Sequence, residues 1–185
     1  RVDTYGLEDG LAPDSPPLAE PRLGVNISLE RYRDERAVTE ALRLVQSLGF
    51  GTVRQRFSWA EIEPVKGQYR WETWDRLLPL VKAHGLEIIA VLDTSPAWAR
   101  PPWEADNPWA PPTYAEDYAR FVGAFAQRYG GYIQAYQIWD QPNIAPHWGK
   151  VPIDPKGYVD LLRLGSTAIR SADAKAIIIA GGLSP

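Results

Sequence analysis

The chain has 185 residues, of which 45% are hydrophobic and 11% aromatic, and its formal net charge is -3. This length fits one domain with a substantial core, and the slightly acidic balance argues against nucleic acid or an anionic membrane as a partner. No apolar run approaches the roughly 18 residues that a membrane-spanning helix needs. The absence of cysteine excludes a disulfide framework and thiol chemistry.

Residues 1–21 contain four prolines and no hydrophobic periodicity, which predicts an N-terminal arm or linker. From residue 22 onward, strand-like runs alternate with helical patterns. The strands are expected at 23–27, 51–57, 87–92, 136–139 and 176–180. Apolar residues spaced three and four positions apart predict a helix after each of the first four strands, at 38–45, 74–81, 118–125 and 158–169.

Strands that alternate with long helices predict a parallel sheet built from right-handed βα units. An open doubly wound sheet is the alternative, but the first strand–helix turn lacks the Gly-x-Gly-x-x-Gly pattern. A (β/α)8 TIM barrel usually takes about 250 residues, and this chain stops just after its fifth strand-like run. We therefore expect residues 22–185 to form the N-terminal portion of such a barrel, about its first five βα units. A further segment or another subunit would complete it.

Tryptophan gathers in the loops that follow the predicted strands, where barrel enzymes carry their functional residues. Five of the eight tryptophans lie there: Trp59, Trp98, Trp103, Trp109 and Trp148. Sugar rings pack their C–H faces on indoles and bind amides and carboxylates through their hydroxyls, so this pattern predicts a saccharide groove. The alternative is a lid in which the tryptophans pack on one another.

The fourth strand-like run leads into the most specific motif of the chain, Trp139-Asp140-Gln141-Pro142-Asn143. With this motif the chain resembles the retaining glycoside hydrolases of the cellulase-like (β/α)8 clan, nearest the family of β-xylosidases and α-iduronidases. In that clan the motif reads Trp-Asn-Glu-Pro, and its Glu is the proton donor. Val53-Arg54, Phe57-Ser58-Trp59, Ile62-Glu63-Pro64 and Thr94-Ser95-Pro96-Ala97-Trp98 are similar to other signatures of the clan.

The resemblance implies a role for each matching position. Gln141 occupies the acid/base position, and Arg54 would lie near the nucleophile and hold it ionised; the alternative for Arg54 is an ion pair inside the barrel. Asp140 would accept a hydrogen bond from the 2-hydroxyl of the sugar, and Asn143 would brace the loop at the site. The remaining substrate contacts expected are His147, Trp59, Trp98, Trp103 and Trp148.

Retaining cleavage needs two carboxyl groups about 5–5.5 Å apart. The resemblance puts the nucleophile on a seventh strand, which this chain does not reach, and Gln141 has no titratable proton. Loss of a general acid typically costs about 10²–10⁴-fold in rate. We therefore expect a glycoside hydrolase-like barrel that is inactive as it stands, with Gln141 either a deliberate replacement or a natural feature of a pseudoenzyme. The alternative is a non-catalytic carbohydrate-binding or assembly protein derived from such a barrel.

Other chemistries find no support in the sequence. There is no phosphate-binding loop and no His-Glu-x-x-His motif, and two distant histidines make a poor ligand set, so neither a cofactor nor a metal is expected. The expected partners are an oligo- or polysaccharide and the polypeptide that completes the barrel. Because polysaccharides lie outside cells, we expect an extracellular or cell-surface location.

Overall fold

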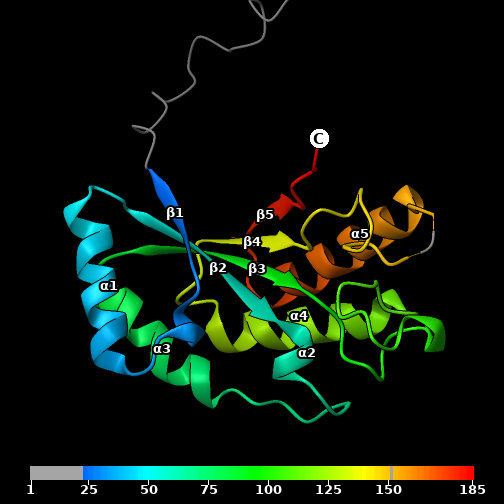
Figure 1. Cartoon of the computed structure of the whole chain (residues 1–185), viewed down its shortest axis with the longest axis horizontal. Helices are drawn as coiled ribbons and strands as arrows, with labels where there is room; N and C mark the ends of the chain where they lie inside the picture. The colour runs from blue at the N-terminus through cyan, green and yellow to red at the C-terminus, as the bar shows by residue number, and fades with distance from the viewer. Residues whose placement is uncertain (1–22, 151) are drawn as a thin grey trace, which may run out of the picture.

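The computed structural model describes residues 23–150 and 152–185, and its strands form a single parallel sheet (Figure 1). The strand order is β1-β2-β3-β4-β5, so each strand pairs with its neighbours in the sequence. The bounds are Gly24–Ile27 for β1, Thr52–Ser58 for β2, Glu87–Asp93 for β3, Ala135–Ile138 for β4 and Ile177–Ala180 for β5. The predicted strands are confirmed to within one or two residues. The arm predicted for residues 1–21 lies outside the described residues.

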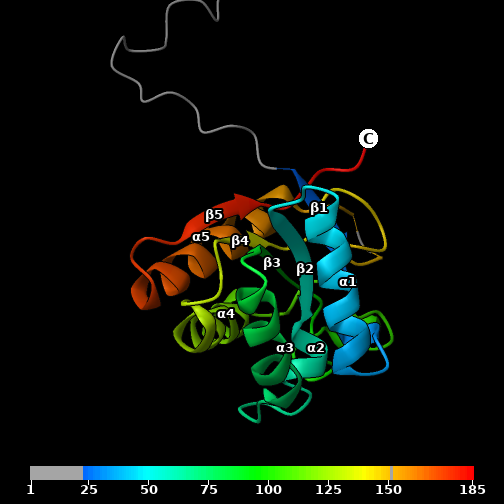
Figure 2. The same ribbon diagram turned by 90° about the vertical axis from the view of Figure 1, so that its left-hand side faces the viewer.

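The predicted helices are also confirmed, one between each pair of strands: α1 Glu35–Ser47, α3 Glu72–Ala83, α4 Ala115–Tyr129 and α5 Pro155–Ala172. All four lie along the same face of the curved sheet (Figures 1 and 2). A short helix, α2 (Trp59–Ile62), follows β2 directly, and the turns η1 (Leu29–Arg31) and η2 (Pro102–Glu104) lie in other loops. Unbroken strand order with helices on one face is the topology of a TIM barrel and not of a doubly wound sheet.

The core lies between the sheet and the helices and is rich in aromatic rings. Phe57 of β2 packs on Trp74 of α3, with ring centroids 4.3 Å apart, and on Phe125 of α4 at 4.8 Å. Alternation along β2 turns Val53, Gln55 and Phe57 toward this core. The residues between them, Arg54, Arg56 and Ser58, are half-buried on the opposite, inner face of the sheet. Polar side chains therefore line the side that the helices leave uncovered.

No helix in the described part of the chain is both long and apolar enough to cross a bilayer.

Candidate active site

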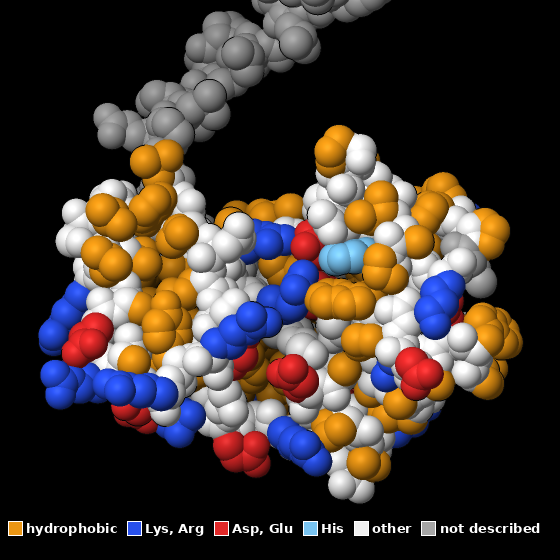
Figure 3. Space-filling model, in the orientation of Figure 1, with side chains coloured by type: hydrophobic (Ala, Val, Ile, Leu, Met, Phe, Trp, Pro, Cys, Tyr) orange, Lys and Arg blue, Asp and Glu red, His pale blue; other side chains and the backbone are white. Residues whose placement is uncertain are grey.

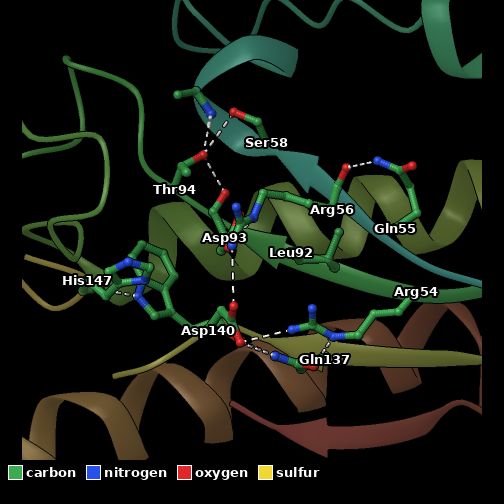
Figure 4. A network of polar contacts seen from close by, with 12 residues as sticks. Arg54, Gln55, Arg56, Ser58, Leu92, Asp93, Thr94, Gln137, Asp140 and His147 are labelled. Atoms are coloured by element: carbon green, nitrogen blue, oxygen red, sulfur yellow. Dashed lines mark hydrogen bonds and ion pairs between the residues drawn. The ribbon is translucent and has the colours of Figure 1, made fainter. Parts of the chain in front are cut away.

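Five polar residues meet at the inner face near the carboxyl ends of β2, β3 and β4, and we call them the arginine–aspartate cluster (Figure 4). They are Arg54, Arg56, Asp93, Gln137 and Asp140. The strand register brings them together. Ser58, two residues after Arg56 on β2, pairs with Asp93 at the end of β3. Gln137 of β4 pairs with Val91, two residues before Asp93. Asp140 follows β4 by two residues. In parallel βα folds this end of the sheet carries the functional loops.

Asp140 is the centre of the cluster. Its Oδ1 accepts hydrogen bonds from Arg54 Nη2 at 2.9 Å and from Gln137 Nε2 at 2.9 Å, and its Oδ2 accepts one from Arg56 Nη2 at 3.3 Å. Arg54 also donates to Gln137 Oε1 at 3.0 Å and to Asn26 Oδ1 at 3.1 Å. Arg54 therefore forms an ion pair inside the sheet, which is the alternative that the sequence left open. Its predicted contact with a nucleophile stays a prediction.

Asp93 is the most enclosed member of the cluster, with a side chain only 1% exposed. Its Oδ2 accepts a hydrogen bond from Arg56 Nε at 2.8 Å, while its Oδ1 has no hydrogen-bond partner within the described residues. Burial raises the pKa of Asp93 to about 7, and the nearby Asp140 adds to this, although Arg56 opposes it. Asp93 is therefore a carboxyl group that exchanges its proton near neutral pH.

An aromatic stack borders the cluster. The Arg56 guanidinium carbon lies 4.5 Å from the ring centroid of Trp109, and the Trp109 and His147 rings are 4.7 Å apart at 17°. The stack joins residues from β2 and from the loops after β3 and β4. Figure 3 shows a hollow in the surface where basic, acidic, histidine and apolar side chains meet. Cationic and aromatic side chains thus hold one another in a fixed arrangement at the edge of the arginine–aspartate cluster.

The backbone is unusual directly after β3 and β4. Thr94, Trp139 and Gln141 have positive φ angles of 61°, 65° and 52°, in the left-handed region that such residues seldom adopt. Gln141 is half-buried, and its backbone N–H donates to the carbonyl of Gly182 at 3.0 Å. The indole of Trp139 donates to the carbonyl of His147 at 2.7 Å. These bonds fix the turn that carries position 141 at the carboxyl end of β4.

Asn143 braces the site. Its Nδ2 donates to the carbonyl of Ser184 at 2.7 Å, and its Oδ1 accepts from the Ser184 N–H at 2.9 Å. Both ends of the amide are engaged by the loop after β5, so its observed contacts are those of a brace and not of a ligand-facing side chain.

Two of the tryptophans predicted to contact substrate belong to the core, which corrects the expectation for them. Trp59 lies on α2, is fully buried and donates to Glu63 Oε2 at 2.7 Å. Trp148 is 3% exposed and packs edge-on against Trp139 and Tyr158. A buried indole offers no surface to a sugar, so packing explains both residues.

The other predicted aromatic contacts remain accessible. Trp98 is half-buried and donates from its indole N–H to the Glu63 carbonyl at 2.9 Å, while Trp103 is 70% exposed. His147 is half-buried in the stack with Trp109.

Sequence reasoning missed Arg56, Asp93 and Gln137, and it did not single out Trp109 among the loop tryptophans. A signal was available for two of them: Arg56 stands two residues after Arg54 and so shares its face of the strand, and Asp93 ends a buried strand. Among the described residues, no group of three or more His, Cys, Asp or Glu side chains could hold a metal ion.

Comparison with known proteins identifies a family whose sequences are similar to this chain. The model of glycoside hydrolase family 42, described as β-galactosidase, matches residues 29–128. That segment ends before β4, so the motif at 139–143 lies outside it. No curated protein matches the chain.

Solved structures of glycoside hydrolases share the fold. A family 39 glycoside hydrolase from Bacteroides cellulosilyticus WH2 superposes with a TM-score of 0.67 at 20% identity, over 85% of this chain and 31% of its own. An exo-β-1,4-mannosidase from Opitutaceae bacterium strain TAV5 gives 0.66 at 22%, over 85% and 31%. A β-galactosidase from Marinomonas ef1 gives 0.62 at 18%, over 86% and 37%.

The chain thus spans about a third of the length of these structures, and at such identities the likeness concerns the fold alone. It confirms the predicted TIM-barrel type with about five βα units present. The family match at residues 29–128 confirms the resemblance to glycoside hydrolases of this barrel type. The nearer placement beside β-xylosidases and α-iduronidases stays a prediction. Because the family model covers more than half of its residues, the chain belongs to the β-galactosidase family of glycoside hydrolases.

Proposed function

We propose that this chain is part of a glycosidase-like barrel that binds saccharides at the carboxyl ends of its strands, with Gln141 in the acid/base position of a retaining O-glycosyl hydrolase. One observation carries the proposal. The Trp139–Asn143 turn follows β4 at the functional end of the sheet, and its Asp140 is bonded to Arg54 and Arg56 from β2. A polar inner face beside an aromatic stack suits a ligand with many hydroxyl groups.

The chemistry of Gln141 limits what this site does. Its amide can donate a hydrogen bond to a glycosidic oxygen, but it has no proton to transfer as the bond breaks. Asp140 is a poor substitute, because Arg54, Arg56 and Gln137 already engage its oxygens. The chain as it stands therefore binds its saccharide without cleaving it efficiently.

The same observation favours a second candidate function, a non-catalytic carbohydrate-binding protein. In that case the hydrogen bonds that Arg54, Arg56 and Gln137 donate to Asp140 fix the Trp139–Asn143 turn for binding alone. In both cases a further polypeptide pairs with the sheet edges, and the protein works outside the cell or on its surface, where polysaccharides are found.

The test is Gln141→Glu in the intact protein, assayed on aryl β-glycosides. A restored proton donor is expected to raise turnover by about 100-fold or more over the parent. Gln134→Glu is the matched control, because Gln134 is exposed at the opposite end of β4 and should leave turnover unchanged. Glycan binding without turnover in either form would favour the binding protein. If neither form cleaves or binds glycans, the proposed function is wrong.

A further inference from the structure

A cavity of about 230 Å³ lies among the loops after β1, β2 and β3. Its wall includes Glu30, Arg56, Ser58, Glu61, Thr94 and Trp109. Neither Gln141 nor Asp140 nor His147 lines it, so this β1–β3 cavity is separate from the acid/base position. Its volume would hold about seven or eight water molecules, which is enough for one monosaccharide unit.

The polar groups of the β1–β3 cavity are held in place by bonds to the protein. Glu30 Oε2 accepts a hydrogen bond from the buried Gln55 Nε2 at 2.8 Å, and Gln55 Oε1 in turn accepts from the Leu29 N–H at 2.8 Å. The hydroxyls of Ser58 and Thr94 lie 3.0 Å apart, and Thr94 also donates to the Asp93 carbonyl at 2.6 Å. Fixed acceptors and hydroxyls lose little entropy when a ligand binds.

Two acidic and two basic side chains line the cavity. Glu30 and Glu61 are acidic, and Arg31 and Arg56 are basic. Arg56 is already committed to Asp93 at 2.8 Å and Asp140 at 3.3 Å. Arg31 faces Glu30 at 3.7 Å. The described residues that line the cavity therefore offer hydrogen bonds to hydroxyls but no free cation for a carboxylate or sulfate. Trp109 also lines the wall, and its ring is held there by packing against Arg56 and His147.

Resting on the proposed function, we propose that the β1–β3 cavity is a second subsite, which binds one neutral monosaccharide unit of a longer saccharide. Arg56 connects it to the rest of the site, because this one side chain lines the cavity, stacks on Trp109 and bonds to Asp140. The two ends of a bound saccharide would thus contact different loops.

Binding of small glycosides to the intact protein tests the subsite. The probes are methyl β-galactoside and methyl β-mannoside, with methyl β-glucuronide as the anionic comparison, and the readout is the indole N–H resonance of Trp109, assigned with Trp109→Phe. The neutral glycosides are expected to shift this resonance and the glucuronide is not. Ala60→Leu, which adds bulk at the cavity wall, is expected to weaken binding by about tenfold or more, a change of roughly 1.4 kcal/mol.

Ala119→Leu is the matched control, because Ala119 is also a half-buried helical alanine but lies on α4, and it should bind as the parent does. Glu30→Gln keeps the side-chain shape and is expected to weaken binding several-fold. This second variant still tests the subsite if Ala60→Leu does not fold. Unchanged binding by both variants, a shift with the glucuronide alone, or no shift with either neutral glycoside would overturn the subsite.

The two proposals fail separately. Turnover by Gln141→Glu without any glycoside effect at Trp109 would overturn the subsite and leave the proposed function intact. Binding in the cavity that Gln141→Glu does not alter, with no turnover, would support the subsite and contradict only the hydrolytic ancestry of position 141.

Discussion

At the residue scale, Asp93 is a carboxyl group that the fold encloses almost completely. Its carboxyl group is enclosed at the end of β3, one oxygen bonded to Arg56 and the other without a partner in the described residues. Because burial raises its pKa from 3.8 to about 7, the folded protein holds a proton on Asp93 that the unfolded chain releases. The free energy of unfolding therefore falls as pH rises between about 4 and 7, and this contribution is constant above that window.

Asp93→Asn should remove this dependence. The parent is expected to lose up to about 4 kcal/mol across the window, while the variant, which never ionises here, should lose much less and be the more stable form at pH 8. Urea unfolding at pH 4.5 and 8 measures both, and the parent-minus-variant difference cancels the other carboxylates. Asp106→Asn, at an exposed residue of the loop that follows β3, should follow the parent. An equal pH slope for Asp93→Asn and parent would contradict the account.

At the element scale, close packing of α5 on α4 and β4 supports the Trp139–Asn143 turn that follows β4. A side chain at Gly165 of α5 would place its Cβ 3.2 Å from Tyr118 Cε1 and 3.2 Å from Ile138 Cδ1. Tyr118 in turn donates from its hydroxyl to the Leu92 carbonyl at 2.6 Å. The contact of helix and sheet is therefore too tight for extra bulk at this point.

Gly165→Val should destabilise the protein by about 1–3 kcal/mol, because overpacking forces the Tyr118 ring or the helix to move. Ser171→Val, on the exposed side of the same helix, introduces the same residue and should cost only a few tenths of a kcal/mol. Chemical denaturation of both variants measures the difference. Equal stability of the two variants would mean that α5 has room to shift.

At the scale of the whole molecule, the described sheet has two open edges. β1 and β5 each pair on one side only, and Leu23, Ile177 and Leu183 are 63%, 51% and 72% exposed near them. Open edges present unpaired backbone groups that invite other strands. This agrees with the expectation that further polypeptide completes the barrel.

The 185-residue polypeptide on its own is therefore expected to self-associate as its concentration rises, measured by light scattering. Ile177→Lys on β5 should reduce the association, because a charge on an edge strand opposes strand addition. Leu44→Lys is the comparison, since Leu44 is 59% exposed on α1 and away from the edges. A monomer at every concentration would show that the edges are protected in another way.

The sequence alone determined the order and bounds of the strands and main helices, because the period of apolar residues reflects local backbone geometry. It also located the Trp139–Asn143 motif at a strand end. It did not determine which loop tryptophans are buried: Trp59 and Trp109 both follow strands, yet the packing of α2 against α4 buries Trp59, which stacks on Phe121.

The arginine–aspartate cluster was likewise decided by the tertiary structure. Arg56, Asp93 and Asp140 come from three strands or their ends, far apart along the chain, and only the lateral register of the sheet brings their charges within bonding distance. Burial of Asp93, and hence its raised pKa, depends on that same assembly. Helices and strands depend on residues that are neighbours in the sequence, whereas pKa values and solvent exposure depend on groups that folding brings together.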